Sequence, residues 1–116
     1  APASLGINFS HGAPGSYFTV TGAYYPPGST GYITVNQRHL GVVATDSSGQ
    51  FSFQLETGPR NDPGPYSVAV TAAVSVQSQF TLAAQGEQHA PEGQGVVFRV
   101  PDGIGQYTLR LSLIAK

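Results

Sequence analysis

The stretch TDSSGQFSF, residues 45–53, is a polar turn followed by an alternating strand. Asp46 and Gly49 favour a tight turn, because an aspartate side chain accepts hydrogen bonds from nearby backbone N–H groups and glycine adopts positive φ without strain. After the turn, apolar and polar residues alternate as far as residue 56. The alternation predicts a core-facing side of Phe51, Phe53 and Leu55 and a water-facing side of Ser52, Gln54 and Glu56. The stretch therefore predicts a β-hairpin whose second strand packs on a hydrophobic core.

The same kind of pattern extends over the first 83 residues. The chain has 15 Gly and 9 Pro, and β-branched and aromatic segments lie between them at a spacing of roughly 8–12 residues, which is typical of β-sandwiches and barrels. Seven strands are expected here: residues 5–9, 17–22, 32–36, 40–45, 50–55, 66–72 and 75–82. Their number and length predict an all-β fold, an immunoglobulin-like Greek-key β-sandwich.

Two further strands are expected after a polar segment. Residues 84–95 carry no large apolar side chain and are predicted to form a loop or linker. Residues 96–116 contain two apolar alternating segments joined by a turn, the second at 107–115, which predicts an extra C-terminal hairpin. Because an isolated hairpin is only marginally stable in water, we expect it to pack on the same sandwich, giving one domain over 1–116 with its core in 1–83. Packing on a partner chain and the start of a second repeat are the alternatives.

The composition excludes several classes of partner. The net charge is -1 and charged residues make up only 9% of the chain, against roughly 25% in an average protein. The five basic residues are scattered, so the electrostatic footprint of a nucleic-acid-binding protein is missing. No apolar run approaches the roughly 20 residues that a membrane span needs, and we expect no membrane insertion. Because the chain has no Cys, disulfides, thiolate catalysis and Cys-ligated zinc are excluded.

Four phrases follow one another in a familiar order: FTVTGAYYPPGSTGYITVN (18–36), LGVVATDSSGQFSFQL (40–55), PGPYSVAVT (63–71) and SQFTL (78–82). Together they resemble the bacterial immunoglobulin-like repeats of secreted and cell-surface proteins, over residues ~15–83. The resemblance implies a non-catalytic structural, adhesion or spacer module of a larger exported bacterial protein. It also implies a location outside the cytoplasm, with neighbouring domains of a longer chain as partners.

The chain opens with small residues, APASLG, and contains no Met. This opening suits the mature side of a signal-peptide cleavage. An excised fragment is the alternative.

Tyr66 opens an expected strand directly after Pro65. This position resembles the tyrosine corner of immunoglobulin-like sandwiches, in which the hydroxyl bonds to backbone upstream and fixes a crossing between the sheets. A half-buried core tyrosine without that bond is the alternative.

The residue types that carry catalysis lack a catalytic pattern. His11, His39 and His89 are expected in three different loops, and none has metal-ligand spacing. Ser48 and Asp46 lie near His39 in sequence, but an extended strand separates the histidine from the aspartate, and no nucleophile elbow is present. We therefore expect a non-enzymatic protein without a cofactor.

Two groups of residues are candidates for ligand binding. Tyr24 and Tyr25 precede a Pro-Pro-Gly turn, and one of such an adjacent pair should face the core while the other faces solvent, where it would stack on a sugar ring. Arg60, Asn61 and Asp62 form a polar cluster in the longest loop of the first half. The partner would be a cell-surface glycan or protein, and the alternative function is a carbohydrate-binding module attached to a secreted enzyme.

A calcium-binding sandwich is a second alternative. Its ligand candidates are the loop oxygens of Asp46, Asn61, Asp62 and Asp102. The chain has no D-x-D-x-D-G ladder to supply the several oxygens that calcium takes, and turn formation by the same side chains is the favoured explanation. Finally, unpaired edge strands or the C-terminal hairpin offer a route to a homo-oligomer.

Overall fold

The computed structural model describes residues 2–91 and 95–102, which form nine strands and no helix. The strands are β1 (Ser4–Ile7), β2 (His11–Gly12), β3 (Tyr17–Ala23), β4 (Thr30–Val35), β5 (Arg38–Ala44), β6 (Phe51–Glu56), β7 (Gly64–Ala72), β8 (Val74–Leu82) and β9 (Val96–Arg99). The second strand expected in the C-terminal hairpin, residues 107–115, lies outside the described residues.

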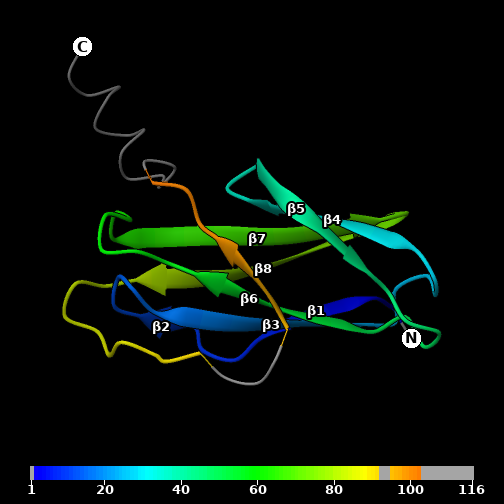
Figure 1. Ribbon diagram of the computed structural model, residues 1–116, viewed down its shortest axis with the longest axis horizontal. Helices are drawn as coiled ribbons and strands as arrows, with labels where there is room; N and C mark the ends of the chain where they lie inside the picture. The colour runs from blue at the N-terminus through cyan, green and yellow to red at the C-terminus, as the bar shows by residue number, and fades with distance from the viewer. Residues whose placement is uncertain (1, 92–94, 103–116) are drawn as a thin grey trace, which may run out of the picture.

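The strands form two layers (Figure 1). The first sheet has the order β1-β3-β6-β9, and the second has the order β2-β8-β7-β4-β5. Neighbouring strands are antiparallel except for β2 with β8 and β6 with β9, which are parallel. The predicted all-β sandwich of two sheets is therefore confirmed.

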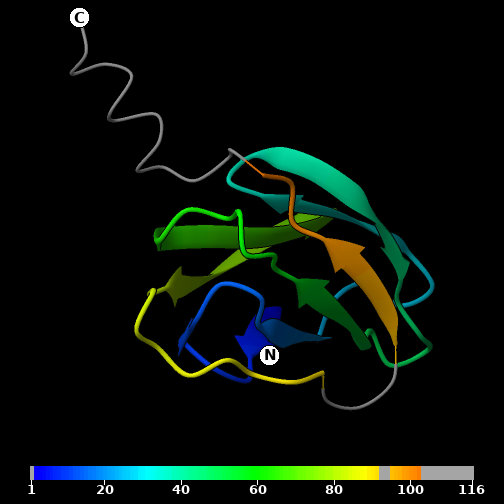
Figure 2. The same cartoon turned by 60° about the vertical axis from the view of Figure 1, so that its left-hand side comes forward.

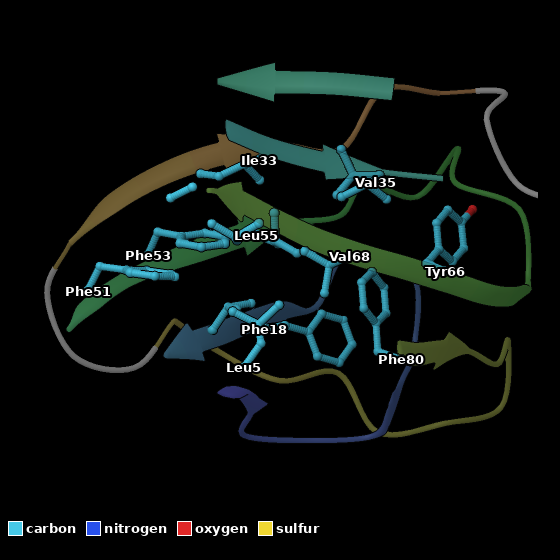
Figure 3. Packing of buried hydrophobic residues seen from close by; sticks show 14 of the residues in the cluster. Leu5, Phe18, Ile33, Val35, Phe51, Phe53, Leu55, Tyr66, Val68 and Phe80 are labelled. Atoms are coloured by element: carbon cyan, nitrogen blue, oxygen red, sulfur yellow. The ribbon is translucent and has the colours of Figure 1, made fainter. Parts of the chain in front are cut away.

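The core lies between the two sheets and is built from the predicted apolar faces (Figure 3). Phe18, Tyr66 and Phe80 form its aromatic centre, with ring centroids 4.3 Å apart for Phe18 and Phe80 and 5.3 Å apart for Tyr66 and Phe80. The predicted inward residues of β6, Phe51, Phe53 and Leu55, are also buried.

Gln54 was expected to face water beside these residues, and that expectation is wrong: only 4% of it is exposed. The reason is its position in an interior strand of the first sheet. Gln54 stands between Thr19 of β3 and Val97 of β9. If the sheet ended at β6, the side of Gln54 away from β3 would have no neighbouring strand.

The hairpin predicted at residues 45–53 is wrong in the pairing of its strands. The turn forms, but β5 belongs to the second sheet and β6 to the first, so the two strands do not pair. The stretch is a corner at which the chain crosses between the layers. Turn residues and alternation describe each strand locally, but they do not determine which neighbour the strand pairs with.

Three expectations concern the ends of the described chain. The first expected strand is shorter, at β1, and the two-residue strand β2 follows it on the other sheet. The described part of the predicted 84–95 loop contains no strand, but it is bonded to the sandwich, because the N–H of Ala13 donates to the carbonyl of Glu87. The expected strand at 96–100 exists as β9 and lies beside β6 in both views (Figures 1 and 2).

Candidate functional site

Polar side chains gather at one end of the sandwich, where β3 begins and β6 and β9 end. We call this the charged end; it consists of residues 13–17, 56–63, 83–91 and 99–102. Its charged side chains are Glu56, Arg60, Asp62, Glu87, Arg99 and Asp102. Asp46 lies at the opposite end, where β6 begins, and we call that the Asp46 end.

The buried residue Ser16 joins the segments of the charged end. Its carbonyl accepts hydrogen bonds from the N–H and hydroxyl of Thr57, at 3.0 and 2.7 Å. Its hydroxyl oxygen accepts the N–H of His89 at 3.0 Å. One residue therefore holds the loop after β6 and the segment after β8 against the start of β3.

Three polar side chains form a row on the outer face of the first sheet. Tyr17 of β3 is opposite Glu56 of β6, and Glu56 is opposite Arg99 of β9. Desolvation raises the pKa of the Tyr17 hydroxyl, and the hydrogen bond and negative charge of Glu56 raise it further. The row therefore combines a tyrosine ring, a carboxylate and a guanidinium.

Arg99 is positioned by the absence of a side chain at Gly58. A Cβ at residue 58 would lie 2.3 Å from a guanidinium nitrogen of Arg99, so the arginine lies across the glycine. The same guanidinium is 3.9 Å from the carboxylate of Asp102, and both side chains are about half exposed. Such an exposed ion pair contributes little to stability.

Two shallow hollows flank His89. One, of about 340 Å³, is lined by Gly15, Tyr17, Gln88, His89, Ala90 and Pro91. The other, of about 350 Å³, is lined by Phe9, Ser10, His11, Glu87 and His89. The His89 ring is stacked on Phe9 with centroids 3.7 Å apart, and its Nε2 atom is 2.8 Å from the carbonyl oxygen of His11. The ring is therefore a fixed wall between the two hollows.

Of the predicted polar cluster, the structure places Asn61 inside the fold. Its Oδ1 atom accepts the N–H of Gly58 at 2.6 Å, and its Nδ2 group donates to the carbonyl of Pro101 at 3.0 Å. Only 2% of Asn61 is exposed, so its amide joins two loops. Arg60 is exposed and Asp62 is half-buried beside it.

The bond expected from the Tyr66 hydroxyl to upstream backbone is present. The hydroxyl of Tyr66 donates a hydrogen bond of 2.7 Å to the carbonyl of Asp62, four residues upstream. Burial and the nearby Asp62 charge raise the pKa of Tyr66 to about 12. Figure 3 shows this hydroxyl oxygen, in red, at the margin of the core cluster.

The four calcium candidates are not brought together. Asp46 is separated from Asn61, Asp62 and Asp102 by the length of β6, which is roughly 20 Å for an extended strand of this size. Its Oδ1 atom instead accepts the N–H groups of Ser48 and Gln50 at 2.8 and 2.9 Å, and these bonds lower the pKa of Asp46. Within residues 2–91 and 95–102, no group of three or more His, Asp or Glu side chains could hold a metal ion.

The tyrosine pair divides between core and solvent as expected. Tyr25 is buried, its hydroxyl donates to the carbonyl of Val70 at 3.0 Å, and burial raises its pKa. Its ring therefore offers no stacking surface. Tyr24 is 62% exposed and has a φ of 63°. Tyr32, 52% exposed, lies on the second sheet opposite Val42.

The sequence predictions did not find the row of Tyr17, Glu56 and Arg99 or the meeting of His11 with His89. The histidines were expected in three separate loops, yet two of them lie in contact, and His39 is in β5. The row joins residues that are about 40 positions apart at each step, so only the pairing of β3, β6 and β9 could have revealed it.

In comparisons with known proteins, no family model matches this chain, and no characterised protein matches it at a significant level of similarity. Among the described residues, there is no helix long and apolar enough to cross a membrane.

Proposed function

We propose that this chain is a non-catalytic, immunoglobulin-like module that acts as a spacer or adhesion unit in a larger exported protein. The observation that carries the proposal is the placement of the two ends of the described chain. The first described residues lie at the Asp46 end, where β1 begins, and the last described residues lie at the charged end, where β9 ends (Figure 1). A module with this arrangement extends a chain of domains by its own length.

The strand order supports the immunoglobulin-like part of the proposal. With β1, β3 and β6 taken as strands A, B and E, and β8, β7, β4 and β5 as G, F, C and C′, the order of these seven strands is similar to that of an immunoglobulin sandwich. The corner bond from Tyr66 to Asp62 is a second hallmark of that fold. The departure is β9, which occupies the edge beside β6 but runs parallel to it.

Small-angle scattering from two copies joined head to tail tests the spacer function. The expected maximum dimension is about twice that of one copy, with an unchanged cross-section, because the first and last described residues lie at opposite ends of the sandwich. A compact particle, in which the two copies lie side by side, would contradict the proposal. A single copy measured under the same conditions is the control.

A second candidate, sugar binding, rests on Tyr24. A non-glycine residue at a φ of 63° is strained by roughly 1 kcal/mol, and here that strained residue presents a largely exposed aromatic ring. On this reading, the chain binds an immobilised neutral polysaccharide, and Tyr24→Ala abolishes the binding while Tyr32→Ala retains it. A sugar site at Tyr24 would be refuted if the polysaccharide retained both variants equally, or if it did not retain the natural chain.

A further inference from the structure

The first and last described strands stand at the two edges of one sheet and run in the same direction. β1 is antiparallel to β3, β3 is antiparallel to β6, and β6 is parallel to β9. It follows that β1 and β9 are parallel to each other, with two strands between them. Ser4 begins β1 opposite Ala23, at the Asp46 end, whereas Arg99 ends β9 at the charged end.

This arrangement determines the direction in which a pulling force loads the hydrogen bonds of the sheet. Tension on the two chain ends draws β1 toward the Asp46 end and β9 toward the charged end, along the axes of both strands. The hydrogen bonds that join β1 to β3, β3 to β6 and β6 to β9 are then loaded together, in shear. If a strand were peeled from one end, its bonds would instead break one after another.

We propose that the first sheet is a mechanical clamp, which resists tension passing from one domain to the next through β1, β3, β6 and β9. The inference rests on the proposed spacer function, and it adds that the spacer carries force. The resisting element is the register of β9 on β6, which brings the C-terminal segment into the same sheet as β1.

The N-terminal segment is held in shear at two places. β1 pairs with β3 through four residues, and the hydroxyl of Ser78 in β8 donates to the carbonyl of Leu5 in β1. Further along, β2 is parallel to β8, and the N–H groups of Thr81 and Ala83 donate to the carbonyls of Ser10 and Gly12, both at 2.9 Å. Because β2 and β8 both run toward the charged end, tension on Pro2 loads this second contact in shear as well.

The C-terminal segment is fixed by packing as well as by pairing. The N–H of Val100 donates to the carbonyl of Glu56 at 2.9 Å, and the Val100 side chain is fully buried. Phe98 packs edge-on against Phe53 with centroids 5.7 Å apart. Its ring also fills the space above Gly41, where a Cβ would lie 2.4 Å away. Together with the amide of Asn61 on Pro101, these contacts surround the point where tension enters β9.

Single-molecule pulling with two attachment geometries tests the clamp. The chain has no Cys, so pairs of introduced cysteines give unique attachment points at exposed residues. Pro2→Cys with Asp102→Cys loads the sheet in shear, whereas Arg60→Cys with Asp102→Cys peels β9 from its end. Because forced unfolding reports the barrier along the pulling direction, we expect the first rupture force to be higher in shear by about a factor of two or more.

Equal rupture forces in the two geometries would overturn the clamp. That result would not affect the scattering test of the spacer. A compact two-copy particle would likewise not affect the difference in rupture force, so the failure of one proposal can be told from the failure of the other.

A matched pair of variants locates the resisting element in the shear geometry. Phe98→Ala should lower the rupture force, whereas Val97→Ala, on the outer face of the same strand, should retain it; equal forces in these two variants would show that β9 packing does not carry the load.

Discussion

The two ends of the sandwich differ in how far apart in sequence their bonded residues lie. At the Asp46 end, the turn is closed by bonds between residues two to four positions apart, such as those from Ser48 and Gln50 to Asp46, and it is joined to residues 25–29 by bonds that span 16 to 24 positions. At the charged end, Asn61 bonds to Pro101 across 40 positions and Ser16 bonds to His89 across 73. The bonds within the turn are encoded locally, whereas the bonds between distant segments exist only once the strands have paired.

The largest expected effect concerns the contact between the turn and Tyr25 at the Asp46 end. In Gly49→Ala, a Cβ would lie 2.0 Å from the carbonyl oxygen of Tyr25, at a residue whose φ is +77°. We expect the free energy of unfolding to fall by about 3 kcal/mol, because backbone atoms would have to move. Chemical denaturation measures the change.

Gly28→Ala is the matched control for that variant. Gly28 also has a positive φ, of +61°, but a Cβ there would meet no atom within 4 Å. Only the backbone preference is lost, at about 1 kcal/mol. If the two variants were equally destabilised, the close approach of Gly49 to Tyr25 would not be what the corner depends on.

The next effect concerns the charged end. Asn61→Ala removes the bonds to Gly58 and Pro101 from a buried site, and we expect a loss of about 2 kcal/mol, since the partners are left unsatisfied. The variant should also release β9, seen as faster amide hydrogen exchange at Val100. Arg60→Ala, at the exposed neighbouring residue, should change stability by less than about 0.5 kcal/mol. If the exchange rate at Val100 were unchanged in Asn61→Ala, the bonds of Asn61 would not be what holds β9 in place.

Tyr66→Phe tests the corner bond within the same end. Loss of the hydrogen bond to Asp62 is expected to destabilise the fold by about 1 kcal/mol. The pKa of Tyr66 is raised from 10.0 to about 12, so the contribution of its neutral form is fully present below pH 10 and is lost as the pH rises toward 12. The natural chain should therefore lose more stability than Tyr66→Phe over that interval. If the free energy of unfolding of the two chains fell in parallel between pH 10 and pH 12, the raised pKa of Tyr66 would be contradicted.

The smallest effect belongs to Asp46. Its pKa is lowered from 3.8 by the N–H groups of Gln50 and Ser48. The stabilisation is therefore present above pH 3.8 and is lost as the pH falls through the lower folded-state value. Asp46→Asn should have a slightly flatter acid-unfolding curve than the natural chain. A steeper curve would mean that the carboxylate is not stabilised by the turn.

The same contrast explains what could be predicted from sequence. The inward residues of the strands, such as Phe18, Phe53 and Val68, were found because alternation depends only on neighbours in the chain. The corner at Asp46 was predicted as a turn but was assigned to a hairpin, since its residues do not specify which sheet each strand joins. Gln54 was placed in water because nothing near it in sequence shows that β9 lies beside it. The row of Tyr17, Glu56 and Arg99 was missed for the same reason.

Hydrogen exchange at β9 in the natural chain tests the central claim most directly, namely that this strand completes the first sheet in parallel register with β6. The Val100 N–H donates to Glu56, so it should be protected at the level of the core strands. The Val97 N–H points away from β6, because bonding groups alternate along a strand. No other described strand lies on that side of β9, so this N–H should exchange rapidly. Rapid exchange at both residues would contradict the account, since β9 would then not be part of the sheet.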